Sequence, residues 1–151
     1  MSDEIKLEFV DTNIFVYAYD VSAGKKHETA KNLVGQLWKS QSGCISIQVL
    51  QELYVSLTKK VNPPLDIDHA AQIIQDLSTW QMYVPGKDDV LQAIEICRRY
   101  KISLWDAMII QSAKCCGCKQ VWSEDLSETQ IYDYIRILNP FVMNENKTPA
   151  G

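Results

Sequence analysis

The chain has 151 residues, of which 46% are hydrophobic and 23% charged, and a formal net charge of −4 at pH 7. This length and composition predict one globular domain with its own core, and they exclude a membrane-spanning protein because no apolar run could cross a bilayer. The acidic balance argues against a protein that binds nucleic acid through basic contacts alone, but less against an enzyme that holds phosphates through carboxylate-bound divalent cations.

The chain is expected to begin with a strand followed by a helix. Polar and apolar residues alternate over Lys6–Val10, which predicts a strand that stops at a polar turn beginning with Asp11. Apolar and aromatic residues then predict a helix over Ile14–Tyr19, with Thr12 or Asn13 near its cap.

Hydrophobic periodicity predicts the rest of the chain as helices separated by short strands. The expected helices are Lys25–Lys39, one after Cys44 with Val49, Leu50, Leu53 and Leu57 on its apolar face, one capped by Asp66, Asp88–Tyr100, and Leu104–Cys116, capped by Ser103. The expected strands are Cys44–Ser46, Met82–Val84, Gln120–Trp122 and Ile135–Leu138. This alternation predicts an α/β fold with a mostly parallel sheet. The polar residues 144–151 are expected to form a disordered tail, which leaves residues 1–143 as the single domain.

The five cysteines are expected to be reduced thiols. Their odd number argues against a closed disulfide framework. Cys115 and Cys118 have the C-x-x-C spacing of some zinc sites, but a structural zinc site needs four ligands, and the sequence has no second pair and no nearby pair of histidines. No basic-then-apolar signal peptide opens the sequence, so we expect a cytoplasmic protein.

Carboxylates follow the predicted strands at the edge where α/β proteins place their active sites. In open parallel sheets, active sites form outside the carboxyl ends of the strands. The acids near such positions are Asp11 after the first strand, Glu52 in the helix after the second, Asp106 in the first turn after Ser103, and Glu124 and Asp125 after Trp122. We therefore expect these acids to meet at one edge of the sheet.

Each acid alone also has a purely structural interpretation. Asp11 suits a turn, Glu52 an exposed helix flank, Asp106 a capping box with Ser103, and the Glu124-Asp125 pair a polar loop. The group is more informative than its members, because clustered carboxylates repel one another unless cations compensate. Oxygen ligands favour Mg²⁺ or Mn²⁺, and one or two such ions can support phosphodiester cleavage. The sequence has no Walker loop and no G-x-G-x-x-G after a strand to indicate another phosphate chemistry.

Four sequence blocks, in order, resemble the PIN-domain nucleases, and more narrowly the VapC-type toxins of toxin–antitoxin pairs. The blocks are Phe9–Ala18, Ser46–Glu52, Ser103–Ile109, and Trp122–Leu126 with Ile135–Phe141 behind it. The resemblance extends over nearly the whole chain. It implies a three-layer α/β/α sandwich, Mg²⁺ or Mn²⁺ as cofactor, RNA as substrate, and a homodimer. It also implies an antitoxin partner that blocks the active site, often with a basic side chain.

Carried over residue by residue, the resemblance makes four acids both catalytic residues and metal ligands: Asp11, Glu52, Asp106 and Asp125. Asn13 would be a polar residue behind the ligands, and Ser123 would hydrogen-bond the first aspartate. The family pattern favours Asp125 over Glu124 as the fourth acid, whereas the residues themselves leave both open. The resulting hypothesis is a metal-dependent endoribonuclease in which Glu52 is a ligand or orients the attacking water.

Residues outside the acidic group are interpreted as RNA contacts or as bystanders. Candidate phosphate contacts are Lys25-Lys26, Lys59-Lys60 and Arg98-Arg99-Lys101, although an ordinary exposed helix surface also explains each of them. Trp105, next to Asp106, is the tryptophan best placed to contact substrate. The hypothesis gives no role to His27 or His69, which lie on predicted helix surfaces.

Other functions share parts of this pattern. A receiver-like phosphoacceptor domain also has an Asp after a strand and binds Mg²⁺, but it would need an acidic pair after the first strand and a Lys after the last, and the sequence has neither. A catalytically silent PIN-like interaction module and a housekeeping RNA-processing nuclease stay open as alternatives.

Overall fold

The computed structural model describes residues 5–128 and 130–142 and contains a six-stranded sheet. The strands are β1 (Glu8–Val10), β2 (Gly43–Ser46), β3 (Gln81–Tyr83), β4 (Gln120–Trp122), β5 (Ile131–Tyr132) and β6 (Ile135–Leu138). Their spatial order is β3-β2-β1-β4-β6-β5, and every pair is parallel except β5 with β6. The predicted α/β fold with a mostly parallel sheet is confirmed.

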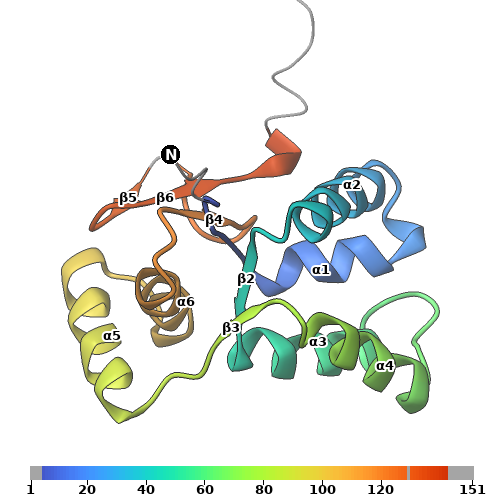
Figure 1. Cartoon of the computed structure of the whole chain (residues 1–151), viewed down its shortest axis with the longest axis horizontal. Coiled ribbons are helices and arrows are strands. Elements are labelled where there is room, and N and C mark those ends of the chain that lie inside the picture. The colour runs from blue at the N-terminus through green and yellow to red at the C-terminus, as the bar shows by residue number, and fades with distance from the viewer. Residues whose placement is uncertain (1–4, 129, 143–151) are drawn as a thin grey trace, which may run out of the picture.

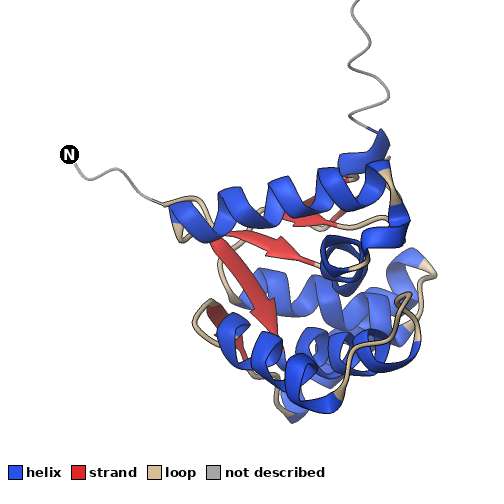
Figure 2. Cartoon of the chain, turned by 90° about the vertical axis from the view of Figure 1, so that its right-hand side faces the viewer, coloured by secondary structure: helices blue, strands red, loops and turns tan. Residues whose placement is uncertain are grey.

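Helices cover both faces of this sheet. They are α1 (Thr12–Tyr19), α2 (Lys25–Ser40), α3 (Ile47–Lys59), α4 (Ile67–Leu77), α5 (Lys87–Tyr100) and α6 (Leu104–Cys115), with a short 3-10 turn, η1 (Val21–Ala23), before α2. Figure 1 shows α5 and α6 on one side of the sheet and α1 to α4 on the other. Figure 2 shows the strands enclosed between helices in a view turned by 90°. The arrangement is the expected three-layer α/β/α sandwich.

The central strands are apolar because helices bury them on both faces. Phe9 and Val10 of β1, Ile45 of β2 and Val121 of β4 are all fully buried. Continuous burial of neighbouring residues is typical of parallel strands between two helical layers. No helix in the described ranges is long and apolar enough to span a membrane.

The helix N-termini show where the sequence interpretation was right and where it was wrong. Ser103 and Asp66 cap α6 and α4 as expected, each accepting a backbone N–H with its side chain. The first helix begins at Thr12 rather than Ile14, so Thr12 and Asn13 lie next to its cap in the first turn. Asp11 is the cap, because its carboxylate accepts the N–H of Thr12 at 2.7 Å.

The remaining differences concern short elements and element ends. The strand β5 was not expected, since it contains only two residues and pairs through a tight turn. Strand β1 begins at Glu8 rather than Lys6, and β3 ends at Tyr83 rather than Val84. Differences of one or two residues at an element end are ordinary fraying. The expected tail at residues 144–151 lies outside the described residues.

Gly43, the first residue of β2, gives a stability prediction because its backbone lies against a buried tryptophan. A Cβ at this position would lie 2.2 Å from Cζ3 of Trp80. We expect Gly43→Ala to lower the free energy of unfolding by about 3 kcal/mol in urea denaturation, since the ring must move within a close-packed core. Gly35→Ala is the matched control: its Cβ would meet nothing within 4 Å, and it should leave stability unchanged or raise it. Equal effects of the two variants would contradict this prediction.

Candidate active site

A cleft of about 630 Å³ opens where the parallel strands end, and every predicted acid lines it. Its walls come from the first turns of α1, the exposed face of α3, the first turns of α6 and the loop after β4. The acids in these walls are Asp11, Glu52, Asp106, Glu124 and Asp125. Segments far apart in sequence therefore meet at one edge of the sheet, as the predicted topology requires.

Asp11 lies at the bottom of the cleft and is the most buried of the five acids, with 6% of its surface exposed. One carboxylate oxygen accepts the N–H of Thr12, and the other accepts the hydroxyl of Ser123 at 2.8 Å. The pKa of Asp11 is raised to about 7, mainly by burial and also by the charges of Asp125 and Glu52, against the lowering effect of the two hydrogen bonds. A cation beside Asp11 would relieve this cost.

Glu52 and Asp106 face the cleft from two helices. Glu52 is exposed on α3, and its Oε1 accepts the hydroxyl of Thr12 at 2.9 Å, which ties α3 to the first turn of α1. Asp106 lies in the first turn of α6, where its backbone N–H is donated to the hydroxyl of Ser103. Partial burial raises the pKa of Asp106, and the charge of Asp125 raises it further. The capping interpretation of Asp106 is therefore correct for its backbone, while its carboxylate lines the cleft.

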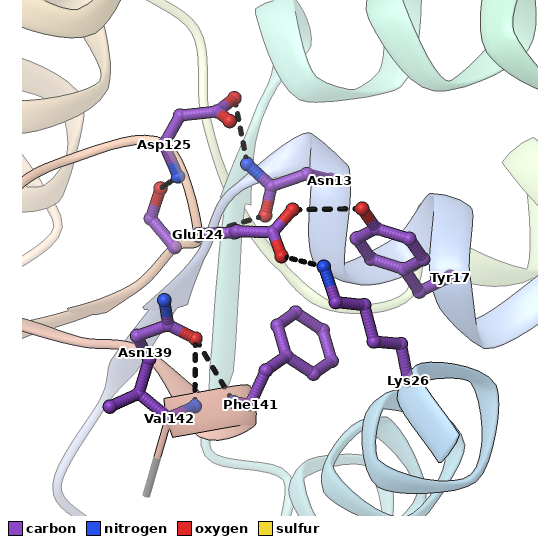
Figure 3. Close-up of polar contacts among 9 residues, drawn as sticks. Asn13, Tyr17, Lys26, Glu124, Asp125, Asn139, Phe141 and Val142 are labelled. Atoms are coloured by element: carbon purple, nitrogen blue, oxygen red, sulfur yellow. Dashed lines mark hydrogen bonds and ion pairs between the residues drawn. The ribbon is translucent and has the colours of Figure 1, made fainter. Parts of the chain in front are cut away.

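The adjacent acids Glu124 and Asp125 point in different directions, as Figure 3 shows. Asp125 Oδ2 accepts the amide Nδ2 of Asn13 at 2.9 Å. Glu124 turns to the other side, where Oε1 accepts the hydroxyl of Tyr17 at 2.8 Å and Oε2 pairs with Lys26 Nζ. Both oxygens of Glu124 are therefore bound within the protein, and the donor to Asp125 is a neutral amide.

The charge balance of the cleft suits a hard divalent cation. Within residues 5–128 and 130–142, Glu124 is the only acid of the five with an ion-pair partner. In the same ranges, no three His, Cys, Asp or Glu side chains are placed to hold a metal ion together. Magnesium does not require such a cage, since one or two carboxylates often hold it while waters and substrate phosphates complete the shell. The donors present therefore fit Mg²⁺ or Mn²⁺.

Several residues of the cleft were not found by sequence reasoning. Thr12, Tyr17 and Gln48 line it, and Gln48 Nε2 donates to the backbone oxygen of Trp105 at 3.2 Å. Thr12 follows Asp11 directly, which was a usable signal. Nothing in the sequence connects Tyr17 with Glu124, because the contact depends on the packing of α1 against the loop after β4.

The candidate RNA contacts occupy different places. Lys60 and Trp105 line the cleft, and Trp105 is 65% exposed. Lys26 pairs with Glu124, whereas Arg99 pairs with Asp133. Among the described residues, the lining of the cleft does not include His27, His69, Lys25, Lys59, Arg98 or Lys101.

Comparison with known proteins gives a family match and a set of similar folds. The family model described as PIN domain matches residues 9–131. Comparison with curated protein sequences gives no match. One similar solved structure is a toxin–antitoxin complex from Klebsiella pneumoniae, with 20% identity and a TM-score of 0.65 over 88% of this chain and 97% of that chain. Another is DNA-bound VapBC from Salmonella typhimurium, with 20% identity and a TM-score of 0.61 over 89% of this chain and 98% of that chain. A third is Mycobacterium tuberculosis VapC20, a Sarcin-Ricin loop cleaving toxin, with 21% identity and a TM-score of 0.58 over 76% of this chain and 86% of that chain. These likenesses show a shared fold.

Proposed function

The chain belongs to the PIN-domain family, and from that premise we propose that it is a metal-dependent endoribonuclease that cuts RNA in the acidic cleft. The observation that carries the proposal is the meeting of five acids from four separate segments, of which only Glu124 pairs with a basic side chain among the residues that the structure describes. A cluster of that kind costs free energy unless it binds a positive ligand.

Asp11, Asp106 and Asp125 are proposed to hold Mg²⁺ or Mn²⁺, with Glu52 as a further ligand or as the group that orients the attacking water. When bound, a divalent cation supplies Lewis-acid stabilisation of the charge on the reacting phosphate and acidifies water. The chain keeps its own donors in place: Ser123 and the Thr12 N–H fix both oxygens of Asp11, and the Thr12 hydroxyl fixes Glu52. These bonds prepare the carboxylates before substrate arrives.

Cleavage is tested with labelled RNA in Mg²⁺, Mn²⁺ or chelator. The proposal expects internal cleavage in either cation and none in chelator. A silent interaction module would leave the RNA intact under all three conditions, and a metal-independent nuclease would cut it equally well in chelator. Either result would show that the proposed function is wrong.

Trp105 is proposed to stack on an unpaired base of the substrate. Its ring is 65% exposed at the cleft beside Asp106, and base stacking on an aromatic ring contributes about 1–3 kcal/mol. We expect Trp105→Ala to raise KM for RNA roughly tenfold with little change in kcat, whereas Trp105→Phe should retain most of the affinity. Steady-state cleavage measures both constants, and an unchanged KM in the alanine variant would exclude the contact.

We further propose that the chain is the toxin of a toxin–antitoxin pair and acts in the cytoplasm as a homodimer. The support is the fold shared with toxin–antitoxin complexes together with an acidic cleft that a basic side chain of an antitoxin could fill. Induced expression in bacteria should stop growth, and Asp11→Asn should not. Unimpaired growth with active enzyme would favour the alternative of a housekeeping RNA-processing nuclease.

A further inference from the structure

Lys26 and Glu124 form an ion pair at the rim of the cleft that the proposed chemistry does not use. Lys26 comes from α2 and Glu124 from the loop after β4. The Lys26 ammonium lies 5.0 Å from the ring centre of Tyr17 and 5.4 Å from that of Phe141, so two aromatic rings flank the pair (Figure 3). The rings add cation–π attraction to a pair whose Lys26 side chain is 44% exposed and whose Glu124 side chain is 24% exposed.

Hydrogen bonds through Asn13 connect Glu124 of this pair with Asp125 in the same loop. The backbone N–H of Glu124 is donated to Asn13 Oδ1 at 3.2 Å, which leaves Asn13 Nδ2 to be donated to Asp125 Oδ2 at 2.9 Å. An amide has one acceptor end and one donor end. Fixing Glu124 therefore fixes which end of Asn13 faces Asp125.

Ser123 makes a second set of hydrogen bonds that hold the same loop. The hydroxyl of Ser123 is donated to Asp11 and accepts the backbone N–H groups of Asp125 at 3.2 Å and Leu126 at 3.3 Å. Ser123 thus connects the backbone of Asp125 to Asp11, and Asn13 holds the Asp125 carboxylate. Among the described contacts, Lys26 anchors the loop to α2 through Glu124, and the hydroxyl of Tyr17 anchors the same side chain to α1.

We propose that Lys26 is a positioning residue which, through Glu124 and Asn13, fixes the position of Asp125 relative to Asp11. This inference rests on the proposed function, because it assumes that Asp11 and Asp125 share a cation. Lys26 contacts neither Asp125 nor Asp11 in the described contacts, and its ammonium is engaged by Glu124 rather than presented to a phosphate.

The affinity of the full chain for Mn²⁺, measured by electron paramagnetic resonance in the absence of RNA, distinguishes a positioning role of Lys26 from a purely electrostatic one. If Lys26 acts by position, Lys26→Met and Glu124→Gln should each weaken Mn²⁺ binding about fivefold, and the double variant should be no worse than either single variant. If only charge matters, the two changes act in opposite directions: loss of the cation tightens Mn²⁺ binding and loss of the anion weakens it. Opposite signs would overturn the proposal.

Two further variants control for folding and for breakage of any ion pair. Lys26→Arg retains the cation and should bind Mn²⁺ within about twofold of the wild type. Lys114→Met breaks the pair with Asp133 at 2.7 Å, in the last turn of α6 and away from the cleft, and should not alter Mn²⁺ affinity. An equal loss in Lys114→Met would also overturn the proposal, and thermal unfolding followed by circular dichroism shows whether each variant is folded.

Kinetics then distinguishes a positioning residue from an RNA contact. Lys26→Met should lower kcat at subsaturating Mg²⁺ and leave KM for RNA unchanged, with recovery at high Mg²⁺. A raised KM with unchanged kcat would make Lys26 a phosphate contact instead. Mn²⁺ binding without RNA cleavage by the wild type would count against the proposed function alone, whereas equal Mn²⁺ affinity in all variants would count against the positioning role alone.

Discussion

Asp11→Asn is expected to reduce RNA cleavage at least about a thousandfold, because loss of a proposed metal ligand would remove several kcal/mol of transition-state stabilisation. The substitution preserves the shape of the side chain. One oxygen still accepts the N–H of Thr12, and only the hydrogen bond from Ser123 is lost, because Ser123 Oγ already accepts two backbone N–H groups and cannot accept the new amide. Single-turnover cleavage in Mg²⁺ is the measurement, and cleavage at the wild-type rate would remove Asp11 from the site.

The same substitution should stabilise the metal-free protein at high pH. Burial raises the pKa of Asp11 from its ordinary 3.8 to about 7, so the folded protein retains this proton at a pH where the unfolded chain has released it. The free energy of unfolding therefore falls as pH rises from about 4 to about 7, and the full loss, up to about 4 kcal/mol, persists above pH 7. Asp11→Asn has no charge to bury and should lack this loss.

Urea denaturation in chelator at about pH 4 and about pH 8 tests this expectation. The variant should be slightly less stable at the lower pH, because it lacks the hydrogen bond from Ser123, and should be the more stable protein at the higher pH. Added Mg²⁺ should then stabilise the wild type at the higher pH more than the variant, since the variant has lost one of the proposed ligand charges. A variant that is less stable than wild type at both pH values would contradict the burial argument.

Much of the fold was predictable because its signals are local. Periodicity located the helices, and the side chains of Asp66 and Ser103 marked two helix starts. Asp11 caps α1 and also lines the cleft, so its structural interpretation is compatible with the proposed functional one. The strand β5 was missed because two residues contain no period to detect.

The choice between Glu124 and Asp125 could not be made from the residues themselves because the deciding contacts are distant in sequence. Glu124 is paired with Lys26, 98 residues away, and Asp125 accepts from Asn13, 112 residues away. Two adjacent acids in a loop look alike in sequence. Only the packing of α1 and α2 against that loop gives one of them a cation and leaves the other beside Asp11.

This difference predicts unequal effects for two otherwise matched substitutions. Asp125→Asn keeps an oxygen for the amide of Asn13 but loses a ligand charge, so we expect cleavage to fall about a hundredfold. Glu124→Gln keeps an oxygen for the hydroxyl of Tyr17 and loses only the ion pair with Lys26, so we expect a loss of about fivefold. Single-turnover cleavage at subsaturating Mg²⁺ compares them directly. If Glu124→Gln loses as much activity as Asp125→Asn or more, Glu124 is the fourth acid, and its pairing with Lys26 must open before the enzyme binds its cation.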